Sequence, residues 1–180
     1  MSGGDAGSTS ARYLTPPADG AGDAWAAEVA ADGRRGSQRV MYAGEALAPD
    51  VVADLLRLPR GDSVVVRRRV MEVDGEPCEL TDSYYPAAIA AGTALEGRGK
   101  IPGGAVRLLA ALGHVGVTAR EDVVARMPGD EERDALAMVT GQPVLELTRL
   151  TLDGEGRPFQ VDIMVMAPRR QRLRYEIKIG

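Results

Sequence analysis

The sequence contains one cysteine, Cys78, and one histidine, His114, among its 180 residues. A single cysteine excludes an internal disulfide and a cysteine-rich zinc site, and a single histidine excludes imidazole metal clusters. No apolar run is long enough to span a bilayer, and the N-terminus has no secretion-signal pattern. We therefore expect no metal, no cofactor, no membrane association and a cytoplasmic location.

Aromatic residues make up only 4% of the chain, so its core has to be built mainly from Val, Leu, Ala, Ile and Met. The apolar share of 44% and the charged share of 27% are typical of a globular domain. Lys and Arg number 22 against 26 for Asp and Glu, a net charge of −4 that argues against a dedicated nucleic-acid binder. The length suits one domain, expected over residues 12–180, after a flexible tail at residues 1–11 rich in Gly and Ser.

The periodicity of the apolar residues predicts an α+β domain, an antiparallel sheet of about six strands with helices on one side. The strongest local signal is a hairpin in which Asp74-Gly75 joins Ser63–Val73 to Pro77–Tyr85. Other extended segments are expected at 38–43, 115–127, 143–152, 157–166 and 171–179. Helices are expected at 24–31, from Pro49, at 103–112, and from Pro128 to Gly141.

Two arginines of the first hairpin strand, Arg67 and Arg69, share one face of that strand, and Arg68 points the other way. A partly buried pair of guanidinium groups suits a carboxylate or a phosphate, because the planar fork binds oxyanions bidentately. The alternative is a solvated strand face, with these arginines paired to neighbouring carboxylates.

The returning hairpin strand places four polar residues on one face, namely Glu79, Thr81, Ser83 and Tyr85. These residues are polar enough to line a pocket, although an exposed sheet face has the same pattern. The small residues of Gly36-Ser37-Gln38 suggest a turn whose backbone N–H groups face an anion, and an ordinary loop explains them equally well.

Several further stretches, taken in order along the chain, resemble a known family. They are Ala48–Leu56, Val65–Arg69, Asp74–Pro77, Asp82–Pro86, Val124–Pro128, Gly141–Arg149 and Gly156–Gln160. Each stretch alone is weak, but together they keep the spacing of the family from about Arg12 to the C-terminus. The chain resembles the UTRA (UbiC transcription regulator-associated) domain of actinobacteria, the effector-binding half of HutC-type GntR regulators.

This resemblance implies a chorismate-lyase-like fold, a cleft for a small-molecule effector, and a homodimer. In that family the ligand controls a winged-helix DNA-binding domain. The positions that match the ligand-binding positions of the family are Arg67, Arg69, Ser37, Gln38, Thr81, Ser83, Thr118, Arg120, Gln160 and Asp162. Many relatives carry carboxylates near Thr81 and Gln160, so recognition of a sugar amine or hydroxyl by such acids is not expected here.

The leading hypothesis is a sensor of an anionic metabolite, with Arg67 and Arg69 as anion ligands and Tyr85 in the cleft. No winged helix is recognisable, so we expect no specific DNA binding by this chain alone. One alternative is an enzyme that catalyses an elimination or a cyclisation through Glu79, Tyr85, Arg120 and Asp162, although no acid–base constellation is recognisable. Another alternative is a dimerisation partner that inactivates a full-length regulator.

Overall fold

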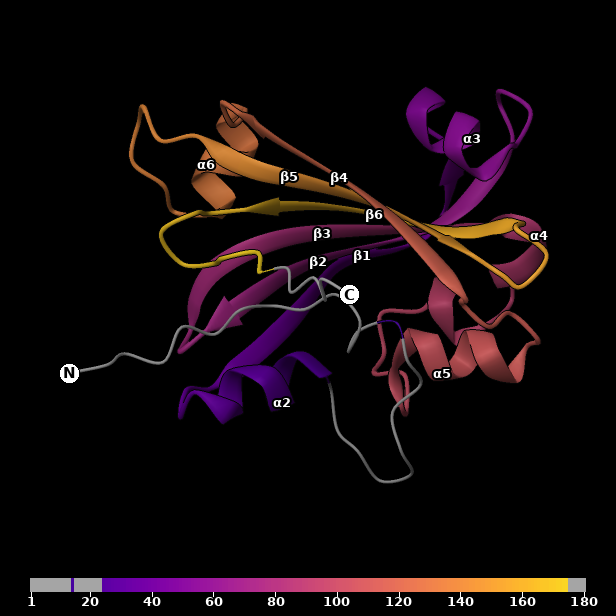
Figure 1. The fold of residues 1–180 in the computed structure, drawn as a ribbon, viewed down its shortest axis with the longest axis horizontal. Coiled ribbons are helices and arrows are strands. Elements are labelled where there is room, and N and C mark those ends of the chain that lie inside the picture. Colours follow the sequence, from indigo (N-terminus) through magenta and orange to yellow (C-terminus); the bar gives the residue numbers. More distant parts are fainter. Residues whose placement is uncertain (1–13, 15–23, 175–180) are drawn as a thin grey trace, which may run out of the picture.

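An antiparallel sheet of six strands forms the centre of the described part of the chain (Figure 1). The computed structural model describes residue 14 and residues 24–174. The strands are β1 (Gly36–Leu47), β2 (Ser63–Val73), β3 (Glu76–Pro86), β4 (Thr118–Arg126), β5 (Val144–Leu152) and β6 (Pro158–Met166). Their order across the sheet is β1-β2-β3-β6-β5-β4. The predicted α+β class and the antiparallel sheet are therefore confirmed.

The hairpin of β2 and β3 forms where the sequence predicts it. Asp74 and Gly75 both take positive φ angles, 55° and 85°, as a two-residue hairpin turn requires. The Asp74 carboxylate accepts hydrogen bonds from the Arg34 side chain at 2.8 Å and from the Arg35 backbone N–H at 2.9 Å. These contacts join the turn to the segment that enters β1, and they lower the pKa of Asp74.

The helices cover both faces of the sheet, so the prediction that they lie on one side is wrong (Figure 1). They are α2 (Ala24–Ala31), α3 (Asp50–Leu56), α4 (Ala87–Ala90), a 3-10 turn η1 (Ala94–Glu96), α5 (Gly104–Ala111) and α6 (Asp130–Ala135). Helix α3 packs Val52 against Val64 and Val66 of β2, whereas α5 packs Leu109 against Val65. Successive side chains of a strand point to opposite faces, so this buried apolar run requires a cover on each side.

Three segments differ from their predicted boundaries. Strand β1 begins at Gly36, so Gly36-Ser37-Gln38 is part of a strand rather than a turn. Helix α6 ends at Ala135 instead of Gly141, and Ala137 takes a left-handed φ of 47°, which a right-handed helix cannot accommodate. Of the strand predicted at 171–179, residues 171–174 contain only an isolated bridge at Leu173.

Residues 175–180 and the predicted tail at 1–11 lie outside the described residues. Within residues 14 and 24–174, no helix has both the length and the apolar content needed to cross a bilayer. The domain boundary predicted at residue 12 therefore stays a prediction.

Candidate functional site

Buried polar side chains gather on one face of the sheet, which we call the polar face. Strand register places Arg67 beside Ser83, Ser83 beside Asp162, and Asp162 beside Arg149, across four adjacent strands. Direct partners in an antiparallel sheet project to the same side, so these residues form a row. The polar and charged residues buried on these strands are Arg67, Glu79, Thr81, Ser83, Arg149, Thr151, Gln160 and Asp162. Burial of polar groups costs stability unless they are paired, so this set, with its partners and its unsatisfied atoms, is the candidate site.

A chain of hydrogen bonds crosses this face from β2 to β6. Arg69 Nη2 donates to Ser83 Oγ at 2.9 Å, and the Ser83 hydroxyl donates to Asp162 Oδ1 at 2.5 Å. From the other side, Gln160 Nε2 donates to Asp162 at 2.8 and 3.0 Å. The Asp162 carboxylate is thus supplied with donors by its neighbours, and it orients both Ser83 and Gln160.

Arg69 is the cation of this network, and one of its hydrogen-bond donors has no partner. Its Nη1 donates to the neutral Gln38 Oε1 at 3.4 Å, and its Nη2 donates to the Ser83 hydroxyl. Its Nε donor is buried and has no hydrogen-bond partner. A guanidinium whose hydrogen bonds go to neutral oxygens and whose buried Nε is unsatisfied is suited to bind an anion.

Arg67 contacts the backbone instead. Its guanidinium donates to the carbonyl oxygens of Ala94 at 3.3 Å, Leu95 at 3.1 Å and Gly99 at 3.4 Å, and also to that of Gly97. Burial lowers the pKa of Arg67, as expected for a cation removed from water, and the carbonyl dipoles offset part of that cost. Arg67 therefore holds segment 94–99 against the sheet, a role that the sequence did not suggest.

Glu79 lies on the same face, and its side chain is buried. Its carboxylate accepts hydrogen bonds from the Thr81 hydroxyl and, at 2.7 Å, from Gln171 Nε2. Burial raises the pKa of Glu79, and these donors oppose the rise. The resemblance to the family suggested that this chain lacks carboxylates near Thr81 and Gln160. The structure places Glu79 beside Thr81 and Asp162 beside Gln160, so a carboxylate lies at each of these two places.

We expect Glu79→Gln to change the pH dependence of stability. Because the folded-state pKa of Glu79 exceeds its ordinary value of 4.5, the folded protein keeps a proton that the unfolded chain has lost. That contribution is complete below pH 4.5 and disappears as pH rises through the raised pKa. Urea unfolding at increasing pH should show the wild type losing stability relative to Glu79→Gln. An equal change in the exposed control Glu45→Gln would contradict this assignment.

Tyr85 closes the polar face at the end near α5. It is buried beside Val65 in register and packs with Leu95 and Phe159. Burial raises the pKa of Tyr85 to about 12, so its hydroxyl is protonated at neutral pH. Seven of the residues selected from the sequence thus share the polar face: Arg67, Arg69, Thr81, Ser83, Tyr85, Gln160 and Asp162. Gln38 contacts this face through its hydrogen bond with Arg69.

Three predicted site residues are not brought to this face. Ser37 pairs in register with Glu72 and donates to its carboxylate at 3.0 Å, on the opposite face. Thr118 and Arg120 pair with Leu152 and Leu150, whose side chains belong to the core under α3. The strand register therefore places Ser37, Thr118 and Arg120 on the face opposite the polar face, since a shift of one residue moves a side chain to the other face. The backbone N–H groups of Gly36-Ser37-Gln38 belong to strand β1 and form no anion-binding turn.

An ion pair that the sequence analysis missed lies at the β5 side of this face. Arg149 Nε donates to Glu121 Oε1 at 2.6 Å, and both side chains are nearly buried, with 9% and 12% of their surfaces exposed. The available signal was the alternation of Arg149 and Thr151 within the apolar strand β5. That pattern did not reveal Glu121 as the partner, because the pairing of β4 with β5 depends on tertiary register.

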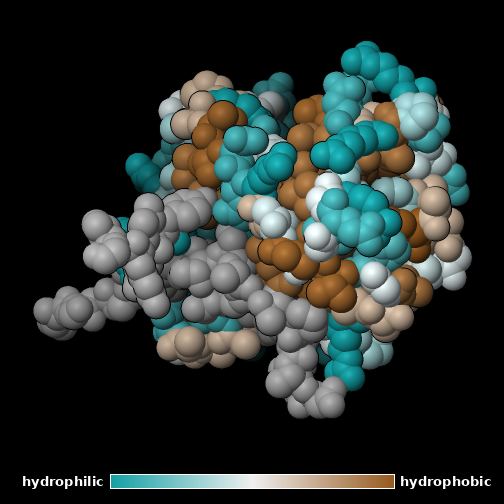
Figure 2. All heavy atoms as spheres, turned by 45° about the vertical axis from the view of Figure 1, so that its right-hand side comes forward, coloured by the Kyte–Doolittle hydropathy of each residue, from teal (hydrophilic) through white to brown (hydrophobic). Residues whose placement is uncertain are grey.

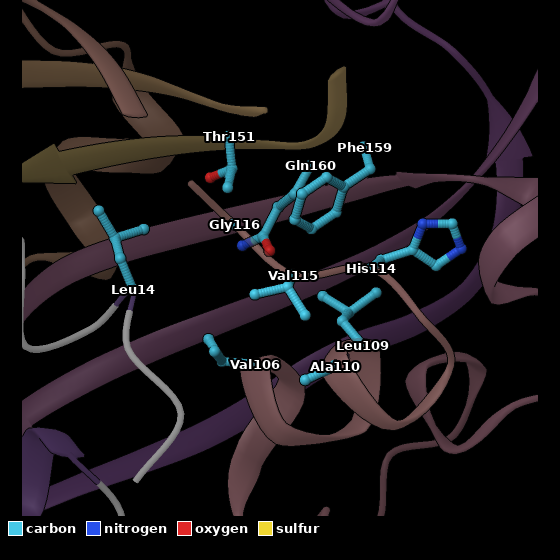
Figure 3. Close-up of a pocket in the computed structure, with 10 residues that line it drawn as sticks. All are labelled: Leu14, Val106, Leu109, Ala110, His114, Val115, Gly116, Thr151, Phe159 and Gln160. Carbon is cyan, nitrogen blue, oxygen red and sulfur yellow. The ribbon is translucent and has the colours of Figure 1, made fainter. Parts of the chain in front are cut away.

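A small hollow lies where the polar face meets helix α5 (Figure 3). Val106, Leu109 and Ala110 of α5 line one side, and Thr151, Phe159 and Gln160 line the other, with Val115 and Gly116 between them. A register shift beside Leu152 lets the consecutive residues Phe159 and Gln160 both face the hollow.

The fold and the buried polar face together define an α+β class of domain, a six-stranded antiparallel sheet with a candidate site on one face. Residues 31–172 match the UTRA domain family, and the chain belongs to that family. The family predicted from the sequence is thus confirmed.

Relatives agree with this assignment. An HTH-type transcriptional regulator of Streptomyces coelicolor is 30% identical over 166 residues, which cover 89% of this chain and 62% of that protein. A crystal structure of a GntR-family regulator is 28% identical, with a TM-score of 0.74, over 83% of this chain and 62% of its own. The ligand-binding domain of a GntR-family regulator from Bordetella bronchiseptica is 24% identical, with a TM-score of 0.71, over 80% and 90% of the two chains. The chain thus spans 62% of the length of the Streptomyces regulator and 62% of the first of these two crystallised proteins.

Proposed function

We propose that this domain senses an anionic small molecule and that Arg69 is the main ligand for its negative charge. The observation that supports this proposal is the unsatisfied, buried Nε of Arg69 beside two neutral acceptors. The two carboxylates nearby, Glu79 and Asp162, already accept hydrogen bonds from protein donors. The charged group of the site that keeps an unsatisfied atom is therefore the Arg69 donor, and an acceptor-rich ligand such as a carboxylate or a phosphate fits it.

The same proposal places the chain in a GntR-type regulator that works in the cytoplasm. Binding of the anion changes the effector domain, and this change controls a winged-helix DNA-binding domain. The matches to regulators of greater length support this arrangement. The net charge of −4 is consistent with a domain that does not itself bind the operator.

Thermal unfolding against a panel of carboxylates and phosphomonoesters, each with a neutral alcohol of equal size, tests the sensor proposal. A ligand at a hundredfold over its Kd adds about 2.7 kcal/mol of stability, which raises the Tm of a domain of this size by roughly 5–11 °C. Stabilisation by acids and not by alcohols is the expected result. Equal stabilisation by both, or by neither, would overturn the anion assignment.

We also propose a homodimer formed through β4, an edge strand of the sheet. Segment 115–127 exposes five large apolar side chains, with 41–68% of each surface accessible: Val115, Val117, Val123, Val124 and Met127. In Figure 2 the hydrophobic residues on the visible face form separate patches divided by polar ones. An edge strand with free backbone groups and exposed apolar side chains favours pairing with a second copy.

Replacing both Val123 and Val124 with lysine is expected to halve the mass measured by analytical ultracentrifugation, because charge on an edge strand opposes strand pairing. Val139→Lys is the matched control, since Val139 is 65% exposed and lies outside the strands. A dimer that survives the double substitution, or dissociates equally in the control, would place the interface elsewhere.

A further inference from the structure

The hollow beside α5 is continuous with the polar face through two of its own lining residues. Its volume of about 10 Å³ has room for about one water-sized group, such as a methyl. Its walls are mainly apolar and come from Val106, Leu109, Ala110, Val115 and Phe159. Leu14 and His114 also line the hollow. Thr151 and Gln160 form the polar end that borders the polar face, and both belong to the buried set of that face.

Hydrogen bonding at the polar end is incomplete. Thr151 Oγ1 is buried and has no hydrogen-bond partner. Gln160 continues the chain of hydrogen bonds that runs through Asp162 and Ser83 to Arg69. At roughly 3 Å a bond, this chain separates the Arg69 guanidinium from the hollow by about 10 Å. One elongated small molecule is long enough to contact both places.

The hollow stays open because residue 116 is a glycine. A Cβ at Gly116 would lie 2.9 Å from Thr151 Cγ2 and 3.7 Å from Phe159 Cζ, so any larger residue would project into this space. Close packing is normal in protein interiors, so a space held open beside an unsatisfied hydroxyl is suited to a ligand.

We infer that the hollow is a second subsite, which takes the apolar end of an effector whose anionic end binds Arg69. The inference rests on the proposed function and makes it more specific. The effector is an organic acid with an apolar terminal group, an alkyl end or the edge of a ring, and an oxygen or nitrogen next to that group meets the Thr151 hydroxyl. A fully polar anion of the same length would leave the walls formed by Val106, Ala110 and Val115 in contact with polar atoms.

Calorimetric titration with straight-chain carboxylates from acetate to decanoate, and with the matching primary alcohols, tests the subsite. In the wild type we expect affinity to rise by up to about fourfold at the chain length whose terminal methyl enters the hollow, and then to level off. Ala110→Leu fills the hollow and should abolish this rise while acetate binds as before. Ala111→Leu is the matched control, because Ala111 is the exposed neighbour of Ala110 on α5 and should keep the rise.

Val106→Ala provides an independent variant that enlarges the hollow, and it should shift the levelling-off to longer chains. Equal chain-length dependence in Ala110→Leu and Ala111→Leu would overturn the subsite, and so would binding of no member of either series. If alcohols show the same rise as acids and Arg69→Ala changes neither, the subsite stands and the anion proposal fails. If affinity rises with chain length for acids alone and this rise persists in Ala110→Leu, the anion proposal stands and the subsite fails.

Discussion

Arg69→Ala is expected to weaken binding of an acid found in the thermal panel by about tenfold to a hundredfold. Hydrogen bonds to a charged group contribute about 1.5–3 kcal/mol each, and 1.4 kcal/mol corresponds to a factor of ten. The fold should tolerate the change, because Arg69 donates only to Ser83 and Gln38 and its Nε has no partner to lose. Isothermal titration of the variant measures the loss directly.

Arg68→Ala is the matched control for this experiment. Arg68 is the next residue on β2, but it points to the opposite face, where it pairs with Asp82 at 3.2 Å and lies over the Tyr42 ring. Removing it changes the net charge by the same amount without touching the polar face. Equal loss of affinity in both variants would mean that long-range charge, rather than a contact with Arg69, attracts the anion.

Arg67→Ala is expected to lower stability rather than to remove a ligand contact. The substitution leaves four backbone carbonyls of segment 94–99 without their donor, next to a cavity where the guanidinium lay. Of these carbonyls only that of Leu95 belongs to a buried residue, and a buried group left unsatisfied costs about 1–3 kcal/mol. With the packing of the guanidinium also lost, we expect a total of about 3 kcal/mol. For a domain of this size the Tm should fall by roughly 6–12 °C.

Limited trypsin digestion tests the local part of this prediction. Arg98 and Lys100 are exposed cleavage sites within or beside the segment that Arg67 holds. In Arg67→Ala the segment should open more often and be cut faster at both sites, because proteolysis follows the population of the open form. Arg67→Lys, with one compact ammonium, should give an intermediate rate. An unchanged cleavage rate and Tm in the alanine variant would show that the segment does not depend on Arg67.

The hairpin, and the part of the polar face that it carries, were predictable because both depend on short-range rules. Asp74-Gly75 specifies a two-residue turn, and the turn fixes which residues of β2 and β3 stand opposite each other. The strict alternation of strand side chains then places Arg67 and Arg69 on the same side as Thr81 and Ser83. No knowledge of the rest of the molecule is needed for these inferences.

The structure separates some of the predicted residues from the polar face, where their position depended on the pairing of β4 with β5. Arg120 was assigned to the cleft, but β4 pairs with β5 in a register that puts Arg120 on the face opposite Glu121. The same register creates the buried pair of Glu121 and Arg149. A shift by a single residue would have reversed these assignments, and nothing in β4 or β5 alone fixes that register.

The sequence by itself determined the family, the α+β class, the hairpin and the candidate residues of one strand pair, since periodicity and turn chemistry are local properties. Only the tertiary structure decided the different roles of the two arginines. Arg67 and Arg69 are equivalent on their strand, yet segment 94–99 packs over Arg67 and supplies carbonyl acceptors, whereas Arg69 keeps an unsatisfied donor. The role of a charged side chain depends on which acceptors the fold brings to it, and these acceptors come from residues about 30 positions away in the chain.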